Sequence, residues 1–330
     1  AITISGGTGS GADAGALALS GGAVATNNHK GGNVAITSGQ SAVTSSGDIT
    51  IASANGGSGT AVSGTLTLST GDSGNSGGSG NSGSIVFSTG KGVSSGLLAL
   101  SSGPSVGSQS GDVLIGTGDS SGSFSGDIKI IPGASLTAAK SGNVVITGGK
   151  ATQAADDKYG GDITLTSGDS TKTHSGDIKI KTAAGAPTTG NTGGTSGLVS
   201  LSSGASTKGN SGALYIGSGN GVSGRSGSIF VTVGSGNSGS GGDIEISAGA
   251  TTTTDGKTGG KLSLMSGNSA KTSSGDIAIA TAAAGLAGVS GKIDMISGAS
   301  ATAGASGLIN IATGSAKDGA SGLLSLSTGA

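Results

Sequence analysis

Seven aspartates stand directly after a glycine and directly before an aliphatic residue, the pattern in this sequence closest to metal chemistry. They are Asp48, Asp112, Asp127, Asp162, Asp177, Asp243 and Asp276. Carboxylates repeated beside glycine turns can bind calcium together with backbone carbonyl oxygens. The alternative is an Asx-type turn, in which each carboxylate accepts hydrogen bonds from nearby backbone amides. Most repeats of the surrounding pattern lack the aspartate, so the turn is favoured, and neither a metal site nor a cofactor is predicted.

The remaining polar residues give little indication of catalysis. His29 and His174 lie outside the apolar segments, and neither has a partner at the spacing of a metal site or a catalytic triad. The many serines lack a nearby base that would make one of them a nucleophile. A polysaccharide lyase would need Arg, Lys and Asp gathered on one face, and Lys129, Lys179 and Asp127 do not make that cluster. We therefore expect no enzymatic activity and name no catalytic residue.

The elements that carry these residues come from one repeated pattern: a glycine, here called the anchor, followed by two large apolar residues with one residue between them. Twenty anchors and a truncated first copy give 21 copies, most of them 15 or 16 residues apart, which is typical of a stacked repeat architecture. The anchors are Gly15, Gly32, Gly47, Gly64, Gly83, Gly96, Gly111, Gly126, Gly142, Gly161, Gly176, Gly197, Gly212, Gly227, Gly242, Gly260, Gly275, Gly291, Gly307 and Gly322.

Apolar residues occupy the second and fourth positions after every anchor, and this period of two predicts a strand. The expected buried ladder includes Ile49, Ile51, Ile163, Leu165, Ile277 and Ile279. A further glycine follows three residues after the second apolar residue in most copies, as in Gly71, Gly90, Gly168 and Gly204, and suits a turn with positive φ. Alanine replaces it at Ala54, Ala183 and Ala282, in related contexts that indicate a longer-range repeat.

We predict an all-β fold, a flattened two-sheet β-solenoid (β-helix) with about two copies per coil, because alternate connections differ in how much length they tolerate. One copy per coil is the alternative. Residues 1–330 would form one continuous domain rising roughly 4.8 Å per coil. Because the sequence begins and ends in the middle of a copy, we expect it to be a segment of a longer chain whose ends meet further coils.

Composition excludes several other classes. Glycine makes up 73 of the 330 residues, yet it does not recur at every third position as collagen requires, and a flexible linker would lack the periodic apolar signal. The net charge of -1, without a charged block, gives no reason to expect nucleic acid as a partner. The sequence contains no run of eighteen apolar residues, so no membrane span is predicted. Cysteine is absent, which excludes a disulfide framework.

The residue between the two apolar residues of a copy should point outward. Among these outward residues, the large apolar side chains of Val86, Leu114, Tyr215 and Phe230 are candidates for a lateral contact between filaments. An ice-binding face would instead need the same side chain in copy after copy. The outward residue changes from Thr50 to Lys129 and Glu245, which argues against such a face.

The run from Ser235 to Gly249, its continuation from Gly260 to Leu264, and the pair of segments 288–291 and 297–300 resemble the very long Gly/Ser/Thr-rich repeat proteins of microalgae. The likeness extends over essentially the whole chain, but its low-complexity motif is only moderately specific. That resemblance implies a secreted or surface-exposed structural role and supplies no site residues.

The leading hypothesis is a non-enzymatic extracellular or cell-surface structural protein that self-associates, with rods stacking end to end into a filament. The alternative is a surface adhesin or a ligand-binding solenoid for ice, glycan or mineral, which would need a repeated ladder of side chains on one outer face. O-glycosylation of the Ser/Thr-rich surface stays open.

Overall fold

The computed structural model describes residues 2–10, 13–25, 29–73, 81–122, 124–136, 140–152, 159–185, 194–252, 256–301 and 304–329. The chain divides into two units, Ala1–Leu165 and Thr166–Ala330. The boundary follows the second apolar residue of the copy anchored at Gly161, so it cuts through a copy and does not mark a change in the repeated pattern. The prediction of one continuous domain over 1–330 therefore stays a prediction.

The prediction of an all-β fold is wrong. The described ranges contain neither a helix nor a strand, and they consist of coil interrupted by short bends and one turn at 286–287. A β-solenoid needs backbone hydrogen bonds from each coil to the next. No backbone hydrogen bond in the described residues joins the apolar segment of one copy to that of another. The predicted β-helix with two copies per coil is therefore wrong as well.

Each copy instead consists of an arm and a loop. The arm is the extended segment of five residues that follows the anchor and holds the two apolar residues. The loop runs from the seventh residue after the anchor to the anchor of the next copy. Among the described residues, eight loops are closed at their base by a hydrogen bond from the anchor N–H to the carbonyl oxygen of that seventh residue, with N···O distances of 2.8 to 3.2 Å. We call this base the neck. The bonded residues lie 8 to 12 positions apart, from Gly15–Gly7 and Gly47–Gly39 to Gly161–Gly149.

Close approach of the backbone at the neck explains the glycine at some of the anchors. A Cβ atom on Gly32 would lie 2.8 Å from the backbone nitrogen of Gly22, and one on Gly161 would lie 2.9 Å from that of Gly149. In other copies the anchor faces a small side chain instead, as Gly176 does Ser167, whose Cβ would be 3.5 Å from a Cβ on the glycine. The anchors Gly32 and Gly161 therefore lie too close to the seventh residue of the preceding copy to carry a side chain, whereas the contact at Gly176 would be an ordinary one.

Positive φ occurs at other glycines than the sequence suggested. The described glycines with positive φ are Gly59, Gly107, Gly239 and Gly256, all of them within loops. The predicted turn glycines Gly71, Gly90, Gly168 and Gly204 do not adopt positive φ. They are open to solvent, since a Cβ atom added to any of them would meet no other atom within 4 Å.

Surface area shows how far the chain is from a packed domain. Its accessible surface is 32240 Å², whereas a compact protein of its 29.9 kDa mass exposes about 12,000 Å² and an unfolded chain about 43,000 Å². No described residue is buried. Two apolar side chains per copy bury little area compared with the conformational entropy lost when a copy becomes ordered, which disfavours a core formed within the chain.

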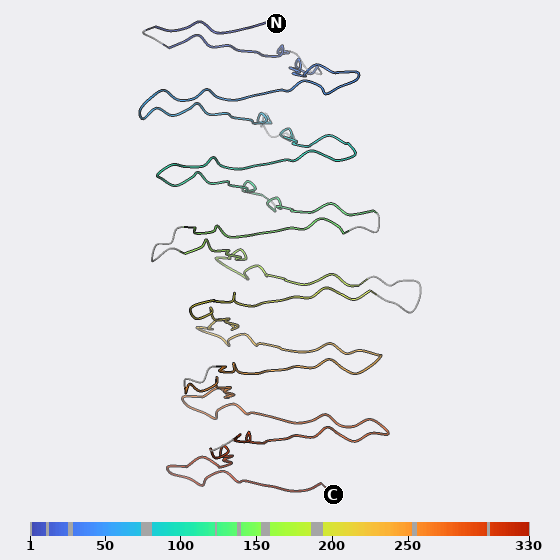
Figure 1. Ribbon diagram of the computed structural model, residues 1–330, viewed down its shortest axis with the longest axis vertical. Coiled ribbons are helices and arrows are strands. Elements are labelled where there is room, and N and C mark those ends of the chain that lie inside the picture. The colour runs from blue at the N-terminus through green and yellow to red at the C-terminus, as the bar shows by residue number, and fades with distance from the viewer. Residues whose placement is uncertain are drawn as a thin grey trace. The chain divides into compact units, whose positions relative to one another are not determined.

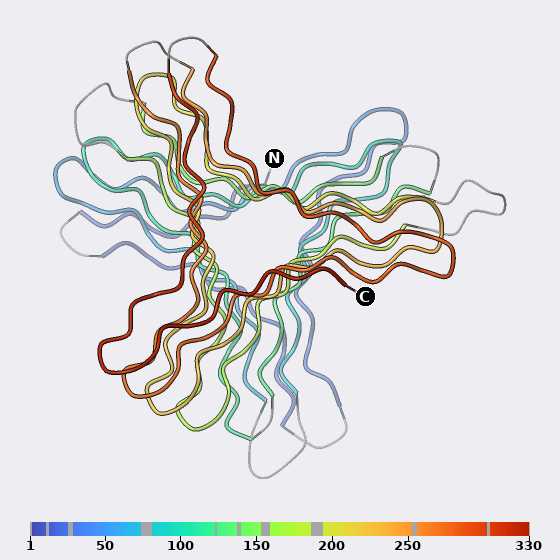
Figure 2. The ribbon, with the colours of Figure 1, turned by 90° about the horizontal axis from the view of Figure 1, so that it is seen from below.

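Within each unit the backbone winds in wide turns (Figure 1), and the loops leave the centre of winding in three directions (Figure 2). Each loop consists of an outgoing and a returning segment that run beside each other near the neck. The arms connect successive loops around the centre. The repeat thus produces local loops at regular intervals, with the arms left unpaired between them.

Candidate functional site

The apolar pairs of the arms are the most regular feature of the surface. Away from the chain ends, the first apolar residue of each arm is 47 to 56% exposed and the second is 59 to 73% exposed. The predicted ladder follows this rule: Ile49, Ile51, Ile163, Leu165, Ile277 and Ile279 are 51 to 68% exposed, so they form no buried core. Both residues of a pair lie on one side of the arm, which we call the apolar side.

The residues on the opposite side, here called the outward side, are more exposed. Val86, Leu114, Tyr215 and Phe230, the candidates for a lateral contact, range from 79 to 93%. Exposure therefore alternates along the arm with a period of two, although no strand pairing is present. Their lateral contact between filaments stays a prediction.

Three ion pairs lie on the outward side, each between the first and third residues of one arm. Lys129 Nζ is 2.6 Å from Asp127 Oδ2, Lys179 pairs with Asp177, and Lys292 Nζ is 2.6 Å from Asp294 Oδ2. All six side chains are at least half exposed, so the pairs add little to stability. Sequence reasoning missed them. The available signal was opposite charge two residues apart on an extended segment, where both side chains point the same way.

Three loops share one hydrogen-bonding pattern, Ser-x-x-Thr near the tip. In each, the serine Oγ accepts a hydrogen bond from the threonine N–H at 3.0 Å and lies 2.9 to 3.1 Å from the threonine Oγ1. The pairs are Ser41–Thr44, Ser170–Thr173 and Ser269–Thr272. These loops precede the three copies whose seventh residue is Ala54, Ala183 or Ala282. The longer-range repeat therefore has a structural counterpart.

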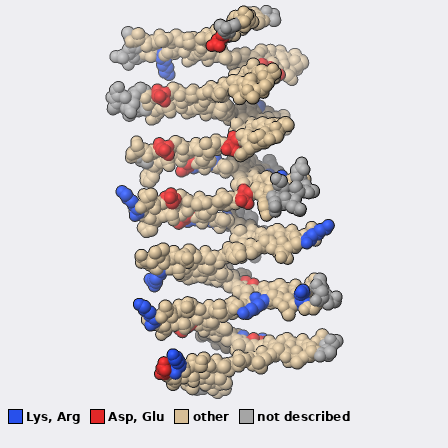
Figure 3. Space-filling view, turned by 90° about the vertical axis from the view of Figure 1, so that its left-hand side faces the viewer, with Lys and Arg blue, Asp and Glu red and all other residues tan. Residues whose placement is uncertain are grey.

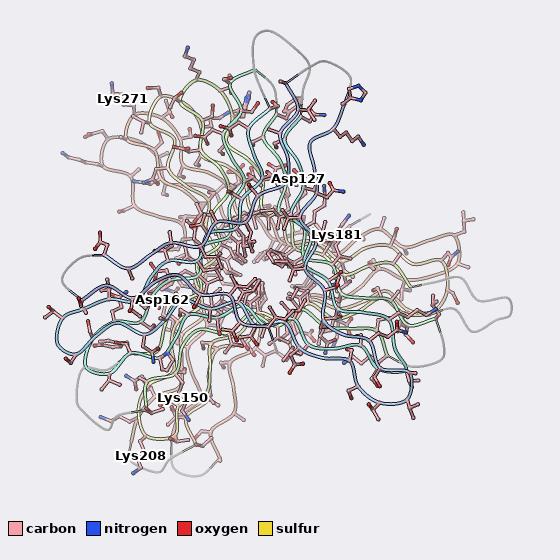
Figure 4. All side chains as sticks on the ribbon, turned by 90° about the horizontal axis from the view of Figure 1, so that it is seen from above. Asp127, Lys150, Asp162, Lys181, Lys208 and Lys271 are labelled. Atoms are coloured by element: carbon pink, nitrogen blue, oxygen red, sulfur yellow. The ribbon has the colours of Figure 1, made fainter. Side chains whose placement is uncertain are left out.

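Loop residues and arm residues occupy different zones of a unit. Lys208 and Lys271, in the loops of the second unit, lie far from the centre of winding, whereas Lys181, on an arm, lies close to it (Figure 4). His174 lies in the second Ser-x-x-Thr loop and is exposed, as is His29. The loops thus form the outer zone of a unit, and the arms with their apolar pairs form the inner one.

The described residues form no enclosed binding or catalytic site. They contain no pocket, and no three acidic or histidine side chains among them lie close enough to hold a metal ion. The seven predicted turn aspartates lie on the outward sides of arms and are exposed. On the face shown in Figure 3, the charged side chains are scattered and form no continuous patch. What the arrangement offers is a long series of similar arms, each with an apolar side open to solvent.

Comparison of the chain with protein-family models, with curated proteins and with solved structures gave no match. Among the residues that the structure describes, no helix has the length and apolar character needed to cross a membrane.

Proposed function

We propose that the chain is a non-enzymatic structural protein that self-associates into fibres through the apolar sides of its arms. The observation that carries this proposal is the half-exposed apolar pair found in copy after copy. Soluble monomers rarely leave large apolar areas open, and areas of this kind are characteristic of interaction sites. A second chain of the same sequence presents the matching surface at the same intervals.

Two further properties support association between copies of the chain. Within the part of the chain that the structure describes, the backbone N–H and C=O groups of the arms form no backbone hydrogen bonds, and such groups favour pairing with another extended segment. The net charge is -1 and charged residues make up 10% of the chain, so electrostatic repulsion between copies is weak. An extracellular or cell-surface location forms part of the proposal, and its support is the resemblance to the microalgal repeat proteins.

The test is the dependence of assembly on concentration. The purified chain should form elongated particles in negative-stain electron microscopy above a critical concentration, and sedimentation velocity should show the monomer pool levelling off at that concentration. A chain that stays monomeric and monodisperse up to millimolar concentration would overturn the proposal. Round, amorphous particles would also count against it, because regularly spaced arms should produce growth in one direction.

A further inference from the structure

Two arms carry outward sides that complement each other in charge. The first, third and fifth residues of the arm after Gly126 are Asp127, Lys129 and Ile131, and those of the arm after Gly291 are Lys292, Asp294 and Ile296. Each arm forms an internal ion pair with an N···O distance of 2.6 Å, in opposite order along the chain. Ile131 is 80% exposed and Ile296 is 82% exposed, so each arm also leaves an outward aliphatic residue in solvent.

We propose that the arm after Gly126 of one chain binds side by side and parallel to the arm after Gly291 of a second copy. This inference rests on the proposed self-association and adds the register in which two chains meet. Side chains directly opposite each other in neighbouring extended segments lie about 5 Å apart. Asp127 then faces Lys292, Lys129 faces Asp294, and the four charges alternate in sign around one network.

Other alignments of these arms satisfy fewer contacts. The arm after Gly126 placed parallel and in register with itself puts Asp127 beside a second Asp127 and Lys129 beside a second Lys129, and like charges directly opposite destabilise pairing. An antiparallel pairing centred on Ile128 matches the charges but places Ile131 opposite Ser125.

The arm after Gly176 has the same Asp-x-Lys order as the arm after Gly126. Its fifth residue is Lys181, however, which would bring a charge against the aliphatic Ile296. The arm after Gly126 is therefore the better match for charge and apolar contact together. Because the matching arms lie in different halves of the sequence, each chain overlaps the next with an offset, and repetition of that overlap extends a fibre.

Disulfide trapping tests this register, because the chain has no cysteine of its own. Ser125→Cys and Ser290→Cys place one thiol directly before each of the two anchors. The two full-length variants, one isotopically labelled, are mixed in equal amounts above the critical concentration in a glutathione redox buffer, and the disulfides are counted by mass spectrometry. Random association makes the mixed disulfide half of all crosslinks. We expect the mixed product to exceed the Ser125→Cys homodimer by roughly five- to tenfold over the random ratio.

The matched control reverses the order of one ion pair without changing composition or net charge. In the Ser290→Cys chain, the double substitution Lys292→Asp with Asp294→Lys retains the internal pair and should return the mixed product to the random ratio. If the chains assemble but form crosslinks at the random ratio both before and after the reversal, the proposed register is refuted. The proposed function is not refuted by that result. An excess of Ser125→Cys homodimer would also overturn the register. A chain that remains monomeric in sedimentation removes the proposed function and the register together.

Discussion

The apolar sides of the arms can be tested by placing a charge on three of them. The variant Ile49→Asp/Ile163→Asp/Ile277→Asp changes the first apolar residue of three well-separated arms, each 51 to 55% exposed in the chain. Full burial of such a side chain is worth about 1.5 to 3 kcal/mol, so covering the exposed half contributes about 0.8 to 1.5 kcal/mol. Distant sites add, and the three together give about 2 to 4 kcal/mol.

At 1.4 kcal/mol per factor of ten, this loss raises the critical concentration for assembly by roughly 30- to 700-fold. The measurement is the monomer concentration that remains in solution after assembled material is sedimented. The monomer itself should change little, because the described residues form no core that the substitutions could disrupt.

The control variant Thr50→Asp/Thr164→Asp/Ala278→Asp adds the same three charges to the same three arms, on the outward side. Both variants change the net charge by the same amount, and the outward-side charges also lie beside Asp48, Asp162 and Asp276. A larger shift in the apolar-side variant therefore reports the apolar contribution. If the two variants shift the critical concentration equally, then charge and not the apolar side governs assembly, and the reasoning fails.

Two further predictions concern the single chain. Below the critical concentration, small-angle X-ray scattering should give a radius of gyration well above the roughly 20 Å of a compact 330-residue protein, and a value near 20 Å would contradict the open structure. Gly161→Ala should open the neck, because the new Cβ would lie 2.9 Å from the Gly149 nitrogen. Amide hydrogen exchange at residue 161, measured by NMR, should then become roughly two- to tenfold faster. The control Gly149→Ala should leave that rate unchanged, because no atom lies within 4 Å of the added Cβ.

The alternation of apolar and polar residues could be recognised from the sequence because it depends only on local geometry. Ile163 and Thr164 point to opposite sides of an extended segment whether or not that segment is paired. Pairing between copies is a different matter, since it depends on a balance between burial and chain entropy that periodicity does not report. For this reason the period of two was recognisable while the β-solenoid built on it was wrong.

The role of the glycines was also misjudged from sequence, for a definable reason. Glycine is needed both where φ is positive and where two backbones approach closely, and the sequence does not distinguish the two uses. Gly168 was expected to serve a turn with positive φ. The structure instead uses its carbonyl oxygen in a neck, where it accepts a hydrogen bond from the Gly176 amide at 2.9 Å.

The ion pairs depend only on local geometry, because the first and third residues of an extended arm lie on the same side. Weighing the charged residues only as a catalytic cluster does not reveal them. Asp127 and Lys129 are too few for that chemistry, but they are adjacent on one side of an arm. The Ser-x-x-Thr loops were visible only as a repeated context around Thr44 and Thr173. That a serine three residues before each threonine would close the tip follows from the tendency of hydroxyl groups to bind nearby amides.

The neck separates two kinds of evolutionary freedom. A bond of similar length closes loops whose ends are 8 residues apart at Gly176 and 12 apart at Gly161, and doubling the length of a flexible loop costs only about 0.6 kcal/mol. Insertions and deletions between two necks should therefore leave the base of the loop, and the start of each neighbouring arm, in place. Under the proposed self-association, a lineage could vary its loops without altering how its chains recognise one another.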